Sequence, residues 1–356
     1  MRHFTNSMEK PDWQLKFKNL PQIPLEKRWN SESTTTEQKL TQKILKEGKI
    51  SSEEEIKLNN LKDFYEELSS ELKNLNYNDF NAEDIINFKN YIFYAFNYTP
   101  LISNDITIVQ SFRLIVNEWV TGENKSLENT RFLSYPPIDI VKKANKYNRA
   151  NTPNTNVLYT TQNINTALLE LKPPLNKLLT VGIWGQKNTK KKLISYPLSH
   201  SSEASEHNDS VSKATFAFEE IAKKNMKILH DILRYYLKLL GHEYTKPVTN
   251  GNHLEYIISS MFSERILSVR KDPNPDFNFD VIVYPSVGNM YKTVNFAIHP
   301  ETVETDFELQ SLLEFEIEEA HYDYEHQFED PFLVTVAKTK NIRHPKAISE
   351  NGKIFW

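Results

Sequence analysis

The stretch Arg149-Ala-Asn-Thr-Pro-Asn-Thr-Asn-Val-Leu-Tyr159-Thr-Thr-Gln-Asn-Ile-Asn-Thr-Ala-Leu-Leu-Glu170 predicts a loop, a strand and a helix, in that order. Asparagines on both sides of its proline are typical of a turn. Residues 157–160 are apolar and partly β-branched, which indicates a buried strand. Asn163 or Asn165 is the candidate N-cap of a short apolar helix that ends before the double proline at 173–174.

Three side chains of this unit, Arg149, Tyr159 and Glu170, have no evident role in a hydrophobic core. A surface arginine, a half-buried tyrosine and a glutamate on an exposed helix face are the common interpretation of such residues. A functional interpretation is also open. A guanidinium, an aromatic face and a carboxylate in one cleft are the groups that hold a dinucleotide and cleave a glycosidic bond.

A family resemblance favours the functional interpretation. The pattern NRAN-x-P-x3-VLY-x6-TALLEL at residues 148–171 resembles the core signature of RES-domain proteins, a family named after an arginine, a glutamate and a serine. Downstream, FDVIVYPSV at residues 279–287 and NFAIHP at residues 295–300 resemble the family's DGIxYPS…NLAL segment. The two matches occur in the family's order, and the resemblance covers roughly residues 110–356. The chain departs from the family's GGRWN at 147–151, where it reads YNRAN, so the shape of this loop stays open.

The resemblance implies an α+β fold of the ADP-ribosyltransferase-like type, with a split mixed or antiparallel sheet and a helical region before it. It also implies an enzyme that consumes NAD+ as its substrate by cleaving the nicotinamide–ribose bond, through hydrolysis, phosphorolysis or ADP-ribosyl transfer. Members of the family act as toxins that arrest growth and pair with Xre-type antitoxins. We therefore expect NAD+ and an antitoxin or other inhibitor protein as partners, and we expect no metal.

The resemblance also gives each candidate catalytic residue a role. Glu170 is expected to accept a hydrogen bond from a ribose hydroxyl and to stabilise the developing cation. Arg149 is expected to pair with the pyrophosphate, because a planar guanidinium suits phosphate oxygens. Tyr159 is expected to stack on the nicotinamide or ribose. Ser286 is expected to hydrogen-bond the ribose or to support Glu170.

Three further residues are candidates for substrate binding. Arg131 is one, because family members carry an early arginine on the first strand of the domain. Asn151 belongs to the same motif as Arg149. Asn295 is expected to hold the loop behind Ser286.

The composition limits the remaining possibilities. The chain has 356 residues, of which 39% are hydrophobic and 12% aromatic, enough for one large domain or two. We divide it into an N-terminal arm and helical region at 1–105 and a RES-like domain at 106–356. The net charge of −4 gives no reason to expect nucleic acid or an anionic membrane. The absence of cysteine excludes disulfides, thiolate metal sites and cysteine nucleophiles. No signal peptide or membrane span is read, so a cytoplasmic location is expected.

Periodicity predicts the other elements. Expected helices cover residues 36–76 in two parts, 82–98, 213–240 with Gly241 as the C-cap, and 252–268. Expected strands cover 178–184, 280–284, 293–298, 314–318 and 332–337. Residues 106–120 are ambiguous, and 112–120 favour a helix.

Several segments keep two interpretations. Residues 198–212 are a mobile loop or a lid over the site. Residues 314–330 carry eight carboxylates and are a solvated face or a dock for a basic partner. The spacing of His321 and His326 suits no common metal site, and no GxSxG, P-loop or GxGxxG motif occurs.

Two alternative functions stay open beside the NAD+-cleaving enzyme. A catalytically silent binding module that keeps the fold is one, although it would not need Arg149, Tyr159, Glu170 and Ser286 together. A nucleic-acid-binding protein is the other, and the overall acidity argues against it. A toxin that modifies a protein target without consuming bulk NAD+ is a variant of the leading interpretation.

Overall fold

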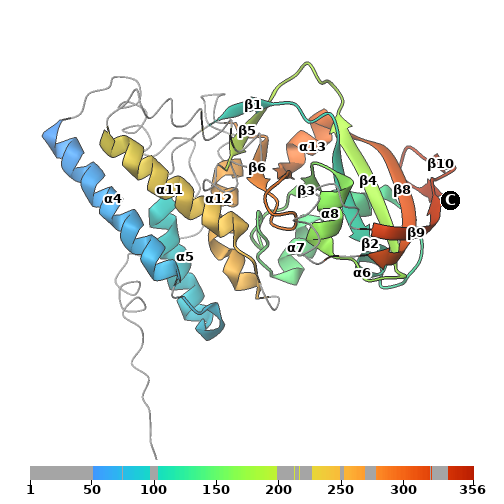
Figure 1. Ribbon diagram of the computed structural model, residues 1–356, viewed down its shortest axis with the longest axis horizontal. Coiled ribbons are helices and arrows are strands. Elements are labelled where there is room, and N and C mark those ends of the chain that lie inside the picture. The colour runs from blue at the N-terminus through green and yellow to red at the C-terminus, as the bar shows by residue number, and fades with distance from the viewer. Residues whose placement is uncertain are drawn as a thin grey trace, which may run out of the picture.

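The computed structural model of the chain describes residues 51–73, 75–96, 103–198, 212, 216, 227–248, 252–268, 278–320, 322 and 336–356. Its helices in these residues are α4 (Ser52–Lys73), α5 (Ala82–Phe96), α6 (Asn117–Thr121), α7 (Ile138–Ala144), α8 (Ile164–Leu171), α11 (Lys227–Thr245), α12 (Ile257–Ser268) and α13 (Pro300–Asp306), with 3-10 turns η1 (Tyr77–Asp79), η2 (Thr130–Leu133) and η3 (His253–Tyr256). Its strands are β1 (Asn104–Ile106), β2 (Ser111–Val116), β3 (Leu158–Thr161), β4 (Leu178–Gln186), β5 (Leu193–Pro197), β6 (Val281–Pro285), β7 (Val294–Ile298), β8 (Phe307–Ala320), β9 (Val336–Arg343), β10 (Ala347–Ile348) and β11 (Ile354–Phe355). The α+β class expected from the sequence is confirmed (Figure 1).

Nine strands form one mixed sheet in the order β1-β5-β6-β7-β3-β2-β4-β8-β9. Strands β5 and β6 are parallel, and the other neighbours in the sheet are antiparallel. The strands expected at 157–160, 178–184, 280–284, 293–298 and 314–318 are all present. The sheet brings β3, β6 and β7 side by side, and so joins the two sequence segments that carry the family resemblance.

The inner strands are buried on both faces of the sheet. On β6, Ile282 and Tyr284 join one buried cluster, whereas Val281 and Val283 join another. Successive residues of a strand point to opposite faces. Because both faces are covered here, the sequence of β6 is a continuous apolar run rather than an alternating pattern.

The long helices cover one face at the β5–β7 end of the sheet, to the left in Figure 1. α11 packs against α4 and β6, and α12 packs against α5. Aromatic rings fill the space between them, with Tyr65 and Tyr236 edge to face at 5.3 Å between ring centroids. The helices of residues 52–96 therefore share one buried cluster with α11, α12 and the sheet, while the division of the chain at residue 105 stays a prediction.

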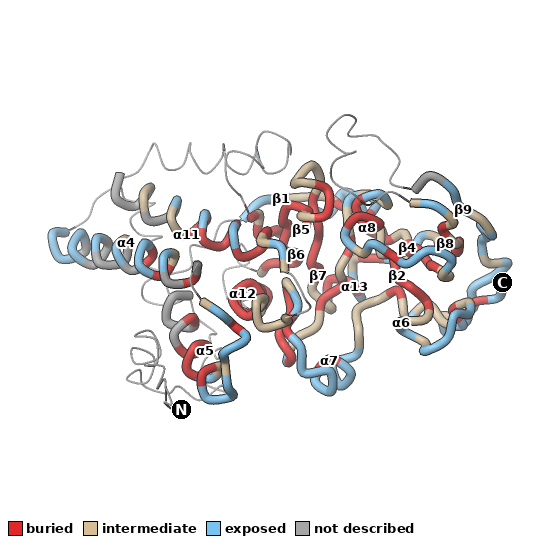
Figure 2. Tube along the Cα trace, turned by 60° about the horizontal axis from the view of Figure 1, so that its bottom comes forward, coloured by how far each residue is buried: buried red, intermediate tan, exposed pale blue. Residues whose placement is uncertain are grey.

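Shorter helices complete the layers. α8 packs on β2, where Ala167 and Leu168 contact the cluster formed by alternate residues of β2, β4 and β8. α13 packs on β8, and Val303 joins the second face of β6 and β7. Figure 2 shows the buried segments concentrated in these inner strands and in α12, while much of α4 and α7 faces solvent.

Two expectations about individual elements are wrong. Residues 112–116 are strand β2 rather than helix, and helix α6 begins only at Asn117. The β-branched, apolar residues of this run fit an inner strand that pairs along its length with β4. Gly241 does not end its helix, because α11 continues to Thr245 with Gly241 buried inside it.

The strand expected at 332–337 overlaps β9 only at its last residues, and residues 331–335 lie outside the described part of the chain.

The acidic strand β8 is neutralised by the basic strand β9. Glu314 is fully buried and accepts a hydrogen bond of 2.7 Å from Arg343 Nε. Glu318 pairs with Lys338 at 2.6 Å, and Glu316 lies 3.7 Å from Lys340. These carboxylates therefore stabilise the β8–β9 pair. The rest of the expected acidic dock, together with the expected lid at 198–212 and the His321–His326 group, lies almost entirely outside the described residues.

Among the helices that the structure describes, none combines the length and apolar character that crossing a membrane requires.

Candidate active site

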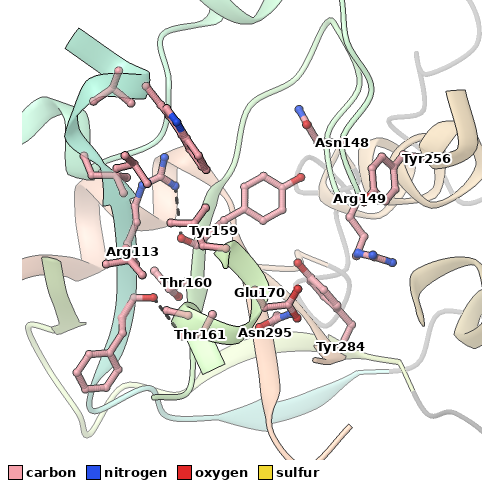
Figure 3. Close-up of a pocket in the computed structure, with 18 residues that line it drawn as sticks. Arg113, Asn148, Arg149, Tyr159, Thr160, Thr161, Glu170, Tyr256, Tyr284 and Asn295 are labelled. Carbon is pink, nitrogen blue, oxygen red and sulfur yellow. Dashed lines mark hydrogen bonds between the residues drawn. The ribbon is translucent and has the colours of Figure 1, made fainter. Parts of the chain in front are cut away.

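A pocket of about 410 Å³ lies where strands β2 and β3 separate. Within the described residues these strands pair only at Phe112 and Thr161, after which β2 stays with β4 and β3 stays with β7. The pocket is lined by Phe112, Arg113, Leu114, Ile115, Val116, Trp119, Val120, Asn148, Arg149, Tyr159, Thr160, Thr161, Ala167, Glu170, Leu171, Tyr256, Tyr284 and Asn295. Four of the seven residues predicted from the sequence line it: Arg149, Tyr159, Glu170 and Asn295 (Figure 3).

Glu170 is held by three donors from the β6–β7 hairpin. Its Oε1 accepts hydrogen bonds from Ser286 Oγ at 2.6 Å, from Asn295 Nδ2 at 2.8 Å and from the Gly288 backbone N–H at 3.3 Å. Its Oε2 has no hydrogen bond to the described residues, and the residue is exposed at the pocket. One carboxylate oxygen is therefore fixed by the protein, while the other is open to a ligand.

The sequence of α8 explains how Glu170 reaches this place. Asn163 is the N-cap, with its side chain accepting a hydrogen bond from the Thr166 backbone N–H at 2.8 Å. The helix ends at Leu171, and its C-cap Lys172 has the left-handed conformation just before the double proline. Ala167 and Leu168 face the core of the sheet, so Glu170 faces the hairpin. The predicted strand, cap and helix of this unit are confirmed.

A second contact fastens the hairpin to α8 one turn before Glu170. Thr166 Oγ1 and Thr293 Oγ1 lie 2.7 Å apart, and Asn289 Nδ2 donates to Thr166 Oγ1 at 3.2 Å. Because Thr166 is four residues before Glu170, both contacts lie on the same face of the helix. The loop that carries Ser286 therefore has two attachments to α8.

Tyr159 has its hydroxyl committed to the preceding loop. The hydroxyl accepts from the Ala150 backbone N–H at 2.8 Å and donates to Asn151 Oδ1 at 2.9 Å. Burial raises the pKa of Tyr159 well above its usual value, so the phenol stays protonated. Asn151 is buried and does not line the pocket. It holds the loop, and the ring of Tyr159 is left to line the pocket.

Arg149 reaches the end of helix α11. Its Nη1 donates to the backbone oxygen of Tyr244, and Nη2 lies 3.5 Å from that of Lys246. Its guanidinium also lies 5.0 Å from the centre of the Tyr256 ring. A cation at a helix C-terminus satisfies free carbonyls and interacts favourably with the helix dipole. Arg149 therefore fixes its loop to α11, and only the remainder of its hydrogen-bonding capacity faces the pocket.

Arg131 lies away from the pocket. It belongs to η2, is exposed and stacks over Phe132 with 5.0 Å between guanidinium carbon and ring centre. The arginine on a strand that lines the pocket is instead Arg113 of β2, which the sequence reasoning missed. The feature that could have revealed it is a single charge inside the apolar run SFRLIV.

Arg113 is a largely buried cation with few partners. Its Nη1 donates to the Tyr159 backbone oxygen at 3.4 Å, across the split between β2 and β3. Its Nε is buried and has no hydrogen-bond partner among the described residues. Burial lowers the pKa of Arg113 to about 10, which leaves the guanidinium charged at neutral pH. A buried charge without a counter-ion is unfavourable, so Arg113 is the group in this pocket best prepared to receive an anion.

Tyrosines complete the wall beside Glu170. Tyr284 directly precedes Pro285-Ser286 in the YPS motif and lies next to Glu170 in Figure 3. Burial raises the pKa of Tyr284 well above its usual value, and its hydroxyl has no hydrogen-bond partner among the described residues. Sequence reasoning used Tyr284 only as part of a motif and did not assign it to the site.

Comparisons with known proteins add no relative: no family model, curated protein or solved structure matches this chain.

Proposed function

We propose that this protein cleaves the nicotinamide–ribose bond of NAD+, in an arrangement of the ADP-ribosyltransferase-like, RES-domain type. One observation carries the proposal. A carboxylate, Glu170, is fixed through one oxygen by Ser286 and Asn295 and opens with the other into a pocket. The same pocket holds an aromatic ring, Tyr159, and a guanidinium, Arg113, whose Nε has no hydrogen-bond partner among the described residues.

Cleavage of the nicotinamide–ribose bond requires a carboxylate, a cation and an aromatic face of this kind. Breaking the bond from nicotinamide to ribose develops an oxocarbenium-like cation, as in glycoside cleavage. Nicotinamide already leaves as a neutral molecule from a cationic ring, so the protein need not protonate it. The protein must hold the dinucleotide and place a negative charge near the developing cation, in a position fixed before the reaction.

The residues divide this work. The open Oε2 of Glu170 accepts a ribose hydroxyl and stabilises the cation. Ser286 and Asn295 orient that carboxylate through its Oε1. Arg113 takes the pyrophosphate role that the resemblance gave to Arg149. Arg149 instead fixes the loop beneath Tyr159, whose ring stacks on the nicotinamide or ribose.

The acceptor of the ADP-ribosyl group decides the biological outcome. Water or phosphate as acceptor would consume bulk NAD+ and arrest growth, whereas a macromolecular acceptor would modify a target without depletion. We propose bulk consumption by a growth-arresting toxin that a partner protein restrains. This proposal rests on the resemblance, whose family consists of growth-arresting toxins that pair with antitoxin proteins.

The test is incubation of the purified chain with NAD+ and measurement of free nicotinamide, with and without inorganic phosphate. Release without phosphate indicates hydrolysis, and release that requires phosphate indicates phosphorolysis. Radiolabelled NAD+ with cell extract tests for transfer to a macromolecule. If no nicotinamide were released with or without phosphate and no label were transferred, the silent binding module would be the better proposal.

Gly288 provides a test of how the loop positions Glu170. A Cβ at this position would lie 2.8 Å from the Glu170 backbone nitrogen and 2.8 Å from the Leu169 carbonyl carbon. Backbone atoms cannot yield as a flexible side chain does, so Gly288→Ala must push the hairpin away from α8. We expect nicotinamide release to fall by about 100-fold, the typical result of misplacing a catalytic group by about 1 Å.

Gly185→Ala is the matched control. Its Cβ would clash with the Val109 backbone oxygen, so it also crowds backbone, but neither residue lines the pocket. We expect this variant to lose some thermal stability while keeping its activity. Equal activity loss in the two variants would mean that general crowding, rather than displacement of the hairpin, causes the effect.

A further inference from the structure

An exposed tryptophan lines the same pocket as Glu170 and Arg113. Trp119 is 59% exposed and the adjacent Val120 is 40% exposed, yet both line the pocket. A single exposed apolar side chain is ordinary on a protein surface. A large indole that borders a pocket calls for a ligand-based explanation when that pocket also holds a largely buried cation, Arg113, with no ion pair to the described residues.

The helix that carries Trp119 is firmly anchored. Asn117, its first residue, is fully buried and donates to Glu314 Oε2 at 3.0 Å, and its Oδ1 accepts from Thr180 Oγ1 at 2.8 Å. Glu118 forms an ion pair with Lys177 at 2.6 Å. The indole is thus presented on a fixed turn, so little conformational entropy is lost when a flat ligand binds to it.

The pocket has an order along its length. Figure 3 shows Tyr159 with Arg113 on one side and Glu170 with Asn295 on the other. Strand β2 then runs from Arg113 to Val116, about 10 Å at 3.3 Å per residue, and continues directly into α6 with Trp119. Along the wall formed by β2 and α6, a guanidinium is therefore followed by an indole, while the carboxylate of Glu170 lies on the other side of Tyr159 from Arg113.

We propose that Trp119 stacks on the adenine base of the dinucleotide, and so makes the site selective for dinucleotides over nicotinamide mononucleotide. This inference rests on the proposed function, and it extends the same site by one subsite. With the nicotinamide ribose at Glu170 and the pyrophosphate at Arg113, the adenosine half extends toward α6. An indole face is the side chain that a planar base binds best.

Calorimetric titration with ADP-ribose tests the proposal without needing turnover. Stacking of one base on one aromatic side chain predicts that Trp119→Ala weakens ADP-ribose binding by about 5- to 150-fold. Trp119→Phe is expected to restore most of the affinity. At saturating NAD+, kcat is expected to stay near the wild-type value, because Trp119 binds the end of the substrate that does not react.

Phe355→Ala is the matched control, since Phe355 is also an exposed aromatic residue, at 45%, but lies outside the pocket. It is expected to leave ADP-ribose binding unchanged. The inference is overturned if Trp119→Ala binds ADP-ribose as tightly as the wild type, or if the wild type does not bind it. Nicotinamide release by the wild type tests the proposed function separately. If the wild type cleaved NAD+ and Trp119→Ala bound ADP-ribose as tightly as the wild type, only the stacking subsite would be disproved.

Discussion

Replacing Glu170 by glutamine is expected to lower kcat for nicotinamide release by about 100- to 1000-fold, the usual effect of removing one preorganised electrostatic group from an active site. Glutamine keeps the size of the side chain and a carbonyl oxygen that still accepts from Ser286, Gly288 and Asn295. The hairpin therefore stays in place while the negative charge is lost. The developing ribosyl cation then has no fixed counter-charge.

The measurement is steady-state nicotinamide release at saturating NAD+, together with calorimetric binding of ADP-ribose. Because the charge acts mainly in the transition state, we expect ADP-ribose affinity to change by only a few fold. Glu350→Gln, an exposed carboxylate outside the pocket, controls for the loss of one negative charge. If Glu170→Gln released nicotinamide at the wild-type rate, the role assigned to Glu170 would be wrong.

Sequence patterns correctly predicted the structural elements that depend only on residues close together in the chain. The order of loop, strand and helix at 149–170 follows from an apolar run, the cap Asn163 and the double proline, all within about twenty residues. The same holds for β6 and β7, whose residues are apolar because both faces of the sheet are covered. These strands, caps and helix ends depend on residues that are close together in the chain, so a single sequence was enough to place them.

The contacts of the site depend on segments that are far apart, and here prediction was incomplete. Glu170 and Ser286 are separated by 116 residues, and only the family resemblance suggested that they meet. Arg149 was expected to face the pyrophosphate, but the carbonyls that it binds lie 95 and 97 residues away, at the end of a helix whose end was itself misplaced. A local pattern contains no information about such partners.

Arg113 was missed for a related reason. Within SFRLIV, an arginine is as compatible with a polar helix face as with a strand, and residues 112–120 were interpreted as helix. Its value to the site comes from the separation of β2 and β3, which is a property of the sheet and not of the strand. The resemblance points to Arg131 in its place, because family members carry an early arginine on the first strand, but Arg131 belongs to η2 and does not line the pocket.

Replacing Arg113 by methionine is expected to have opposite effects on binding and on stability. Without the guanidinium, the pyrophosphate loses charge-assisted hydrogen bonds in a partly desolvated site, and ADP-ribose binding is expected to weaken by about 100-fold. In the free protein, however, Arg113 makes one hydrogen bond of 3.4 Å and leaves its Nε without a partner among the described residues. Removing such a charge relieves an unfavourable burial, so we expect Arg113→Met to unfold with a free energy about 1 kcal/mol higher than the wild type.

Two other arginines separate this prediction from a general effect of losing a cation. Arg149→Met removes hydrogen bonds to Tyr244 and Lys246 and the stacking on Tyr256. It is therefore expected to destabilise the fold by about 1–3 kcal/mol. Arg131→Met, exposed and outside the pocket, is expected to change neither quantity. Urea unfolding and calorimetric titration with ADP-ribose measure both quantities on all three variants.

The sign of the stability change decides the interpretation of Arg113. A folded-state pKa lowered to about 10 means that the fold disfavours the charged guanidinium, and at neutral pH this cost is fully present because the group is charged in both the folded and the unfolded chain. Binding of an anion removes the cost, which is how an unpaired buried cation contributes to affinity. If Arg113→Met were less stable than the wild type and bound ADP-ribose equally well, Arg113 would be a structural bridge across the split between β2 and β3, and the pyrophosphate would have to be assigned to Arg149 after all.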